Sequence, residues 1–112
     1  MDFSFSKKNR ILSRKEFSRL YSLGLKREAR FFYVHYLFKD GEPKIGLTVS
    51  RKVGNAVKRS FVKRHLREAF RVRKSYGLSG LQMIISAKKS ASFAEGLQLQ
   101  KDLERILNEI SS

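Results

Sequence analysis

Residues 51–74 read RKVGNAVKRSFVKRHLREAFRVRK, and the rest of the chain is best understood around this stretch. It holds ten of the 25 basic residues of the chain and a single acidic residue, Glu68. With Asn55 as the N-cap, a rotation of about 100° per residue predicts a helix with two distinct faces. The apolar face comprises Val57, Phe61, Val62, His65, Leu66, Ala69 and Val72. The basic face comprises Arg59, Lys63, Arg67, Arg71 and Lys74, with Ser60 and Arg64 on its flank.

The basic face carries charges of one sign four residues apart, at positions 59, 63, 67 and 71. Like charges at this spacing repel each other on a helix, so an anionic partner is expected to offset the repulsion. A solvated surface is the usual explanation for charge on a helix. Such surfaces normally mix both signs, whereas this one does not, and the pattern therefore favours a polyanion-binding helix.

The composition points to nucleic acid as the polyanion. The chain has 112 residues, a formal charge of +15 and a pI of about 10.6, which favours binding to phosphates with release of their counterions. A membrane surface is the competing anion, but a helix lying on it needs exposed apolar residues that a single domain of this size uses for its core. Residues 91–112 carry two basic and four acidic side chains, so this segment is excluded from the predicted polyanion surface.

The sequence also indicates where the protein resides. It has no cysteine, which excludes disulfides and thiolate metal sites and is compatible with a reducing compartment. Its first residues, MDFSFSKKNR, lack the apolar region of a signal peptide, and no run reaches membrane-spanning length. We therefore expect a soluble cytoplasmic protein with no membrane partner.

The remaining elements follow from local patterns, and we expect one RNA-binding domain spanning residues 1–112. Residues 1–12 are expected to form an irregular arm. Ser13 and Glu16 form a capping box that opens a helix, which Gly24 ends as the C′ residue. Residues 31–38 and 44–50 predict two strands joined at Asp40-Gly41 as an antiparallel hairpin.

After the basic helix, residues 81–87 (LQMIISA) predict a third strand, parallel to the second because a helix connects them. Ser92 and Glu95 predict a cap for a last amphipathic helix, whose apolar residues are Phe93, Leu97, Leu103, Ile106, Leu107 and Ile110. The predicted order is αββαβα: a small α/β sandwich of one mixed sheet with helices packed on it. The sheet flank between the first helix and the basic helix would combine aromatic and cationic side chains, as in single-stranded nucleic-acid sites.

The sequence gives only weak support for catalysis by the protein alone. His35 and His65 are far apart and stand in no metal-ligand spacing, and the carboxylates are scattered. His65 lies on the apolar face of the basic helix, where a partly buried core histidine is expected. Gly54-Asn55 is explained as a turn and a cap rather than as a nucleotide-binding loop.

Four aromatic side chains are candidates for stacking on nucleic-acid bases: Phe17, Tyr21, Tyr33 and His35. Tyr33 and His35 share one face of a strand by period two. Phe17 lies on a helix face, where a core position is the default alternative.

At its centre the sequence resembles a known family. Residues 46–50 read GLTVS, residues 52–57 read KVGNAV and residues 59–67 read RSFVKRHLR. This is similar to the signature of the bacterial ribonuclease P protein subunit, in which a GLxVS strand is followed by KxG(N/K)AV and an RNxxKRxxR helix. The similarity extends over residues 9–87. Upstream it includes Arg10, Ile11, Leu12, Phe17, Tyr21, Gly24 and Phe32.

The resemblance implies a cofactor protein of a catalytic RNA that removes the 5′ leader from precursor tRNA. Magnesium ions bound to the RNA are implied to perform the hydrolysis, so the protein alone is not expected to cleave, and no protein oligomer is required. The implied fold contains a left-handed βαβ crossover, although about 98% of such connections are right-handed. The implied RNA-binding residues are Lys52, Asn55, Lys58, Arg59, Ser60, Lys63, Arg64, Arg67 and Arg71. A leader cleft formed by the first helix, the sheet and the basic helix is implied to contain Phe17, Tyr21, Tyr33 and His35.

Two positions depart from the family signature. The family usually has Asn at the position of Ser60 and commonly Arg or Lys at that of Phe61.

Two alternative functions remain at this point: a ribosomal or chaperone-like RNA-binding protein, and a protein-only nuclease. The combined signature of residues 46–67 argues against a ribosomal or chaperone-like protein, because a generic basic protein has no reason to carry it. The absence of a clustered carboxylate or histidine site in the sequence argues against a protein-only nuclease.

Overall fold

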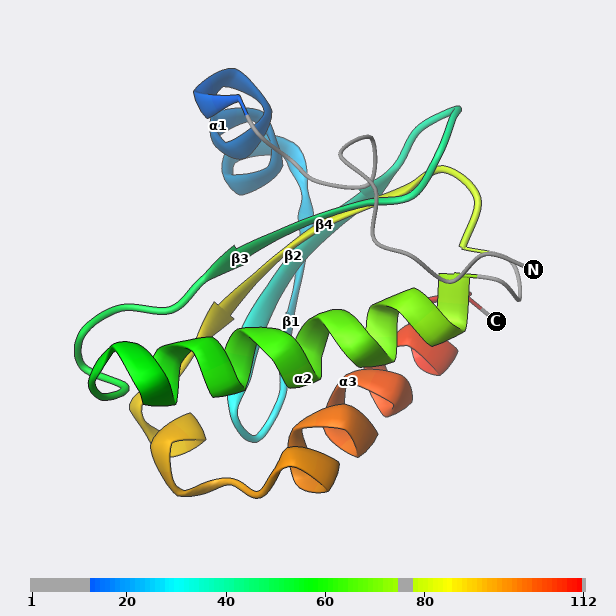
Figure 1. The fold of residues 1–112 in the computed structure, drawn as a ribbon. Coiled ribbons are helices and arrows are strands. Elements are labelled where there is room, and N and C mark those ends of the chain that lie inside the picture. Colours follow the sequence, from blue (N-terminus) through cyan, green and yellow to red (C-terminus); the bar gives the residue numbers. More distant parts are fainter. Residues whose placement is uncertain (1–12, 75–77, 112) are drawn as a thin grey trace.

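The computed structural model describes residues 13–74 and 78–111 and shows three α-helices, one short 3₁₀ helix and four strands within them (Figure 1). The expected N-terminal arm, residues 1–12, lies outside the described residues. The elements in chain order are α1 (Arg14–Leu23), β1 (Leu25–Glu28), β2 (Phe32–Phe38), β3 (Lys44–Thr48), α2 (Ala56–Lys74), β4 (Leu81–Ala87), η2 (Lys89–Phe93) and α3 (Gly96–Ser111). The predicted αββαβα order is present, with β1 and η2 as additions.

The four strands form one mixed sheet in the order β1-β2-β4-β3. β4 pairs antiparallel with β2 and parallel with β3, so the predicted parallel pair is confirmed. The predicted hairpin between β2 and β3 is wrong, because β4 lies between them. The reason is the apolar character of β4, in which Met83, Ile84 and Ile85 are all fully buried. A strand with apolar residues on both faces is stable only in the interior of a sheet.

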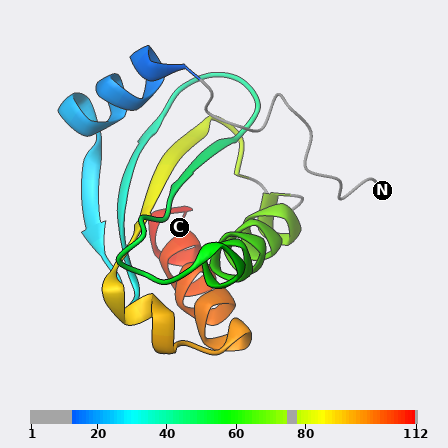
Figure 2. The same cartoon turned by 60° about the vertical axis from the view of Figure 1, so that its left-hand side comes forward.

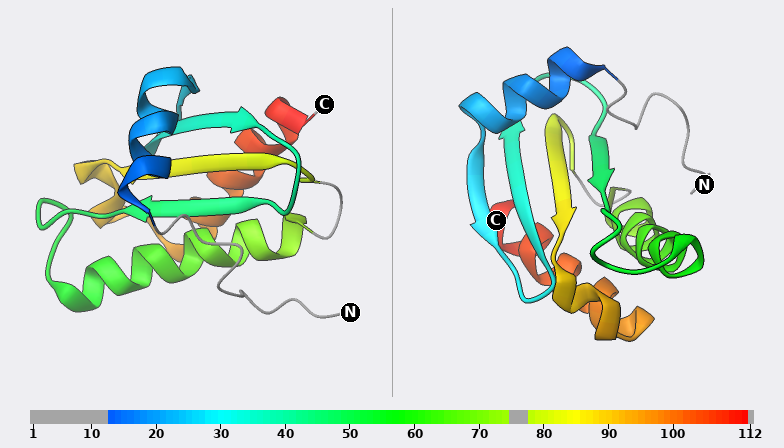
Figure 3. Two further views of the ribbon diagram at one scale, coloured as in Figure 1. Left: turned by 90° about the horizontal axis from the view of Figure 1, so that it is seen from above. Right: turned by 90° about the vertical axis from the view of Figure 1, so that its left-hand side faces the viewer.

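The β3–α2–β4 connection is left-handed, as the family resemblance implies. Viewed from the α1 side in the left panel of Figure 3, β3 runs to the left, α2 returns to the right behind the sheet, and β4 lies above β3 in the view. Following this path turns the chain in the sense opposite to the common right-handed crossover. The left-handed connection places α2 on the face of the sheet opposite α1, next to α3.

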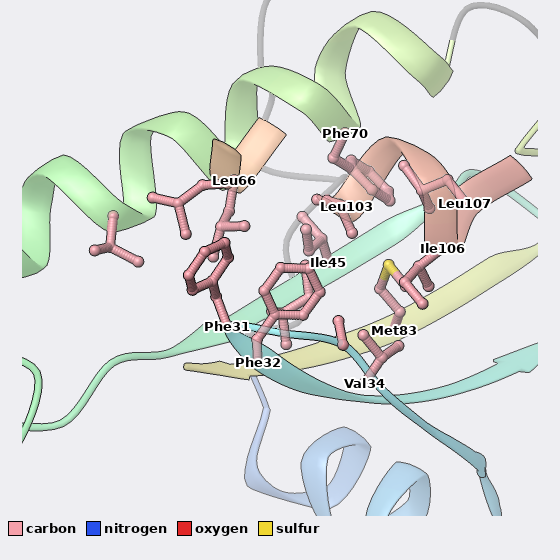
Figure 4. Close-up of a cluster of buried hydrophobic side chains, with 14 of the residues drawn as sticks. Phe31, Phe32, Val34, Ile45, Leu66, Phe70, Met83, Leu103, Ile106 and Leu107 are labelled. Carbon is pink, nitrogen blue, oxygen red and sulfur yellow. The ribbon is translucent and has the colours of Figure 1, made fainter. Parts of the chain in front are cut away.

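The two faces of the sheet are covered unequally (Figure 2). α2 and α3 cover one face and enclose the main core, in which Val34, Met83, Leu66, Phe70 and Ile106 are buried (Figure 4). α1 lies on the other face and buries only a small cluster around Leu20 and Ile84. Much of this second face is therefore open.

α1 begins as predicted, since the Ser13 side chain accepts a hydrogen bond from the backbone N–H of Glu16. Its end differs from the prediction, because Gly24 has an extended backbone with a φ of −72° rather than the left-handed C′ conformation. Glycine is needed there for a different reason. A Cβ at position 24 would collide with the carbonyl oxygen of Leu20 and crowd the backbone of Tyr36.

The apolar face of α2 is rotated from its predicted position. Val62, Leu66 and Phe70 are fully buried, whereas Val57 is 80% exposed and Val72 is 39% exposed. Phe70 is absent from the predicted face, and Val57 and Val72 were wrongly placed on it. The predicted face spans the arc from Val57 to Leu66, whereas the buried side of the helix is centred on Leu66 between Val62 and Phe70.

α3 begins one turn later than predicted, after the 3₁₀ helix η2. Ser92 is therefore not its cap, and the first-turn contact is a hydrogen bond from the Glu95 N–H to the Gln98 side chain. Phe93 is 85% exposed and Leu97 is 65% exposed, whereas Leu99 joins the core instead. The other predicted apolar positions of α3 do contact the core: Leu103, Ile106, Leu107 and Ile110.

Candidate nucleic-acid interface

The open face of the sheet carries the four predicted aromatic residues, which we call the aromatic surface: Phe17 and Tyr21 from α1, and Tyr33 and His35 from β2. The side chains of β2 alternate, so Val34 and Tyr36 enter the main core while Tyr33 and His35 point to the other face. The structure thus brings together rings that lie up to 18 positions apart in the sequence. α2 packs on the opposite face, so it does not form a wall of this surface as the family resemblance implied.

Tyr21 is the centre of the aromatic surface. Its ring centroid lies 4.8 Å from that of His35 in an edge-to-face arrangement and 6.4 Å from that of Phe17. Its hydroxyl lies 3.3 Å from the Ser86 hydroxyl of β4, within hydrogen-bonding distance. The side chain is nevertheless 45% exposed, so an oriented ring is presented to solvent.

Phe17 is partly buried beneath this surface. It packs with Leu20 and Ile84, and its ring lies directly on Gly46 of β3, where an added Cβ would stand only 2.7 Å from the ring. The Lys44 ammonium, 3.2 Å from the Glu16 carboxylate, also ties α1 to β3. Phe17 is therefore largely a packing residue, and Gly46 lets its ring approach the strand.

Tyr33 is surrounded by cations. The Lys26 and Lys88 ammonium groups lie 5.0 Å and 4.6 Å from its ring centroid, within cation–π range. Lys88 is fixed by an ion pair with Glu28 and by a hydrogen bond of 2.8 Å to the carbonyl of Ala29. The ion pair with Lys88 also lowers the pKa of the Glu28 carboxyl.

Three contributors to the aromatic surface were missed from the sequence: Lys26, Ser86 and Lys88. β1 was not predicted, because its sequence LKRE carries little apolar signal. Ser86 could have been found from the period of β4, whose residues 82, 84 and 86 point away from the core residues Met83 and Ile85.

The surroundings of His35 favour its neutral form. Burial lowers the pKa of its imidazole, and the positive charge of Lys26 lowers it further. Its Nδ1 atom is buried and has no hydrogen-bond partner within residues 13–74 and 78–111. An uncharged ring suits contact with a nucleotide base more than ion pairing with a phosphate.

Basic residues form a second surface on α2, which we call the basic stripe: Arg59, Lys63 and Arg67. At about 100° per residue, Arg59 lies within about 20° of the buried Leu66, and Lys63 within about 20° of the buried Phe70. The stripe as a whole lies on the side of the helix away from His65. His65 faces α3, where the Gln100 side-chain nitrogen lies 2.7 Å from its Nδ1. Arg67 is exposed, whereas Arg59 and Lys63 are half-buried.

The loop before α2 and its first turn carry the other predicted RNA-binding residues. The Asn55 side chain accepts a hydrogen bond of 2.9 Å from the Lys58 N–H, which confirms it as the N-cap. Lys52 and Ser60 are exposed. Gly54 has a φ of +153°, and a Cβ there would contact the Lys58 side chain. This turn thus fixes how the helix begins.

Two arginines at the end of α2 make intramolecular contacts. Arg71 pairs with Glu68. Arg73 donates hydrogen bonds of 3.0 Å to Asn108 and 2.9 Å to Ser111, which hold α2 against α3. Arg71 is therefore less suited to RNA binding than the sequence suggested.

The described residues offer neither a metal-binding cluster nor a membrane-spanning helix. Residues 13–74 and 78–111 contain no group of three histidine, aspartate or glutamate side chains that could hold a metal ion. The helices in these ranges include none of the length and apolarity required to cross a bilayer.

Comparison with known proteins identifies the family. The family model described as Ribonuclease P matches residues 5–111. The chain belongs to the ribonuclease P protein family. It is 38% identical to the ribonuclease P protein component of Geotalea uraniireducens over 109 residues, covering 96% of both chains. It is 35% identical to that of Bacillus cereus over 105 residues, covering 92% of this chain and 88% of the relative.

Solved structures of the family agree with the fold. The RNase P protein of Staphylococcus aureus superimposes with a TM-score of 0.84 at 34% identity, covering 91% of this chain and 94% of that one. The family forms the protein subunit of ribonuclease P, a ribonucleoprotein endoribonuclease of tRNA processing that works with an RNA subunit. This assignment decides against the alternative of a ribosomal or chaperone-like RNA-binding protein.

Proposed function

We propose that the two surfaces of this ribonuclease P protein bind different RNAs. The basic stripe, together with Lys52, Lys58 and Arg64, binds the catalytic RNA. The aromatic surface holds the 5′ leader of precursor tRNA. We assign the hydrolytic magnesium ions to the RNA, as membership of the ribonuclease P family suggests.

One observation carries the leader assignment: exposed rings and ammonium groups occupy the same open sheet face. Tyr21 is 45% exposed and Tyr33 is 36% exposed, and two lysines lie over the Tyr33 ring. Single-stranded RNA offers bases that stack on such rings and phosphates that attract nearby cations. A duplex would hide its bases and gain little from the rings.

The direct test of this function is reconstitution of the ribonucleoprotein. The purified chain is mixed with a bacterial ribonuclease P RNA and precursor tRNA at low magnesium, and 5′ cleavage is followed. We expect the chain to stimulate cleavage, whereas the protein without RNA should not cleave. Absence of stimulation would contradict the proposed function.

The basic stripe is tested by its salt dependence. Lys63→Gln with Arg67→Gln should lower the slope of log affinity against log salt by about 1.4 to 1.8, at 0.7 to 0.9 per phosphate contact. Glutamine keeps part of the aliphatic stem of each residue, and the thermal midpoint should stay nearly constant. Lys39→Gln with Lys101→Gln is the matched control, because both lysines are exposed and lie outside α2. Equal slopes for the two double variants would remove the stripe from the RNA interface.

A further inference from the structure

The outward surface of the first half of α2 carries apolar side chains, although this helix is strongly basic. A shallow hollow there, which we call the outer hollow, is lined by Ala56, Val57, Ser60, Phe61 and Arg64. Val57 is 80% exposed, and Phe61 is half-buried with one edge against the core. The hollow lies roughly opposite the buried side of the helix, so core packing accounts for one edge of Phe61 but not for the exposed Val57.

Cations flank the aromatic ring of this hollow. The Lys58 ammonium lies 5.2 Å and the Arg64 guanidinium carbon 5.7 Å from the Phe61 ring centroid. The His65 ring lies 4.5 Å away at an angle of 59° and supports Phe61 from the α3 side. The acidic residue of α2, Glu68, is paired with Arg71 one turn beyond the hollow. The outer hollow thus combines an aromatic ring with positive charge.

This combination fits one class of ligand. A purely apolar peptide would leave Lys58 and Arg64 without anionic partners. A regular RNA duplex would offer phosphates but would have no base to place on Phe61 and Val57. An unpaired nucleotide offers both a planar apolar base and a phosphate.

We propose that the outer hollow binds one unpaired nucleotide of the RNA subunit, with its base against Phe61 and its phosphate between Lys58 and Arg64. The Ser60 hydroxyl, exposed in the hollow, supplies a hydrogen bond to the base or the sugar. The inference rests on the proposed function, in which α2 faces the catalytic RNA.

Substitution of Phe61 gives the first test, read as affinity for a bacterial ribonuclease P RNA. Phe61→Leu should weaken binding by about 5- to 150-fold, the range for losing one stacked base, whereas Phe61→Tyr should bind like the unmodified chain. Phe93→Leu is the matched control, because Phe93 is 85% exposed and lies outside the hollow. Thermal melting of each variant separates lost binding from lost folding. Unchanged affinity of a folded Phe61→Leu variant would overturn the inference.

A second test uses the unmodified chain and therefore does not depend on a variant that folds. NMR spectra are recorded with a single-stranded adenosine pentanucleotide and with a ribose-phosphate oligomer of the same length that lacks bases. The Phe61 ring and Val57 methyl signals should shift with the first probe and not with the second. Signals of the basic stripe should shift with both probes. Equal shifts of the Phe61 and Val57 signals with both probes would reduce the hollow to a phosphate site and contradict the inference.

The two proposals can fail separately. If the Lys63 and Arg67 double variant loses salt dependence while Phe61→Leu binds normally, the outer hollow is not a base site and the stripe remains an RNA surface. If neither variant changes binding, α2 does not face the catalytic RNA and both proposals are wrong.

Discussion

The aromatic surface and the basic stripe lie on opposite sides of one sheet and are built in different ways. The aromatic surface draws on α1, β1, β2 and β4, with Tyr21 touching both His35 and Ser86. The basic stripe comes from consecutive turns of α2 alone. A surface assembled from several elements is sensitive to changes in packing, whereas a surface on one helix responds mainly to changes in charge. The two surfaces can therefore be disrupted independently.

The largest expected effect comes from a change in the strand on which the Phe17 ring of the aromatic surface packs. Gly46→Ala places a methyl group 2.7 Å from the Phe17 ring, so α1 or the ring must move. We expect a loss of about 1 to 3 kcal/mol in the free energy of unfolding, typical of overpacking, measured by denaturant titration. Affinity for long-leader precursor tRNA should fall as well.

Thr48→Ala is the control for Gly46→Ala, since Thr48 is exposed two residues further along the same strand. It should leave both stability and leader affinity nearly unchanged. Normal stability of the Gly46→Ala variant would show that Phe17 is not held against β3.

The next effect concerns Tyr21 itself. Tyr21→Ala should weaken binding of precursor tRNA with a leader of several nucleotides by about 1 to 3 kcal/mol, the value of one stacked base. Mature tRNA and a one-nucleotide leader should be bound almost normally, and the thermal midpoint should change little because the side chain is 45% exposed. Tyr21→Phe keeps the ring and should retain most of the affinity.

For Tyr21→Ala, an equal loss with long and short leaders, or a large fall in the thermal midpoint, would assign Tyr21 to the core. Leader binding would then be left to Tyr33 and His35 on β2.

The same contrast explains how much of the molecule could be predicted from sequence. The helix α2 and its Asn55 cap are determined by residues close together in the sequence, and both were predicted correctly. The hairpin was predicted wrongly, because local turn signals cannot reveal that β4 inserts between β2 and β3. The Lys26 and Lys88 contacts with Tyr33 depend on the pairing of β1 with β2 and the antiparallel register of β2 and β4. Sequence patterns thus identified the basic stripe and the rings but not the partners that orient the rings.

A smaller effect is expected from pH. The pKa of His35 is lowered in the folded chain from its ordinary value of 6.5. Just below pH 6.5, the His35 imidazole therefore binds a proton more readily in the unfolded chain than in the folded chain. Stability should therefore fall as the pH decreases below about 6.5, and it should level off once the folded imidazole is also protonated.

His35→Phe should reduce this pH dependence, as measured by thermal melting between pH 5 and pH 7.5. An NMR titration of His35 in the unmodified chain should give a midpoint below the ordinary value. A midpoint at or above 6.5 would contradict the burial of this ring.

The separation of leader binding from binding of the catalytic RNA is tested most directly by a double-mutant cycle. The cycle combines Tyr21→Ala with the Lys63→Gln and Arg67→Gln pair. One measurement is the affinity of the reconstituted ribonucleoprotein for tRNA substrate with and without a leader. The other is the affinity of the protein for the catalytic RNA. We predict that Tyr21→Ala affects only the leader-bearing substrate, that the pair affects binding of the catalytic RNA, and that the combined effects add within about 0.5 kcal/mol. A coupling well above that value, or a loss of catalytic-RNA affinity in Tyr21→Ala equal to that of the pair, would show that the two surfaces bind one RNA together.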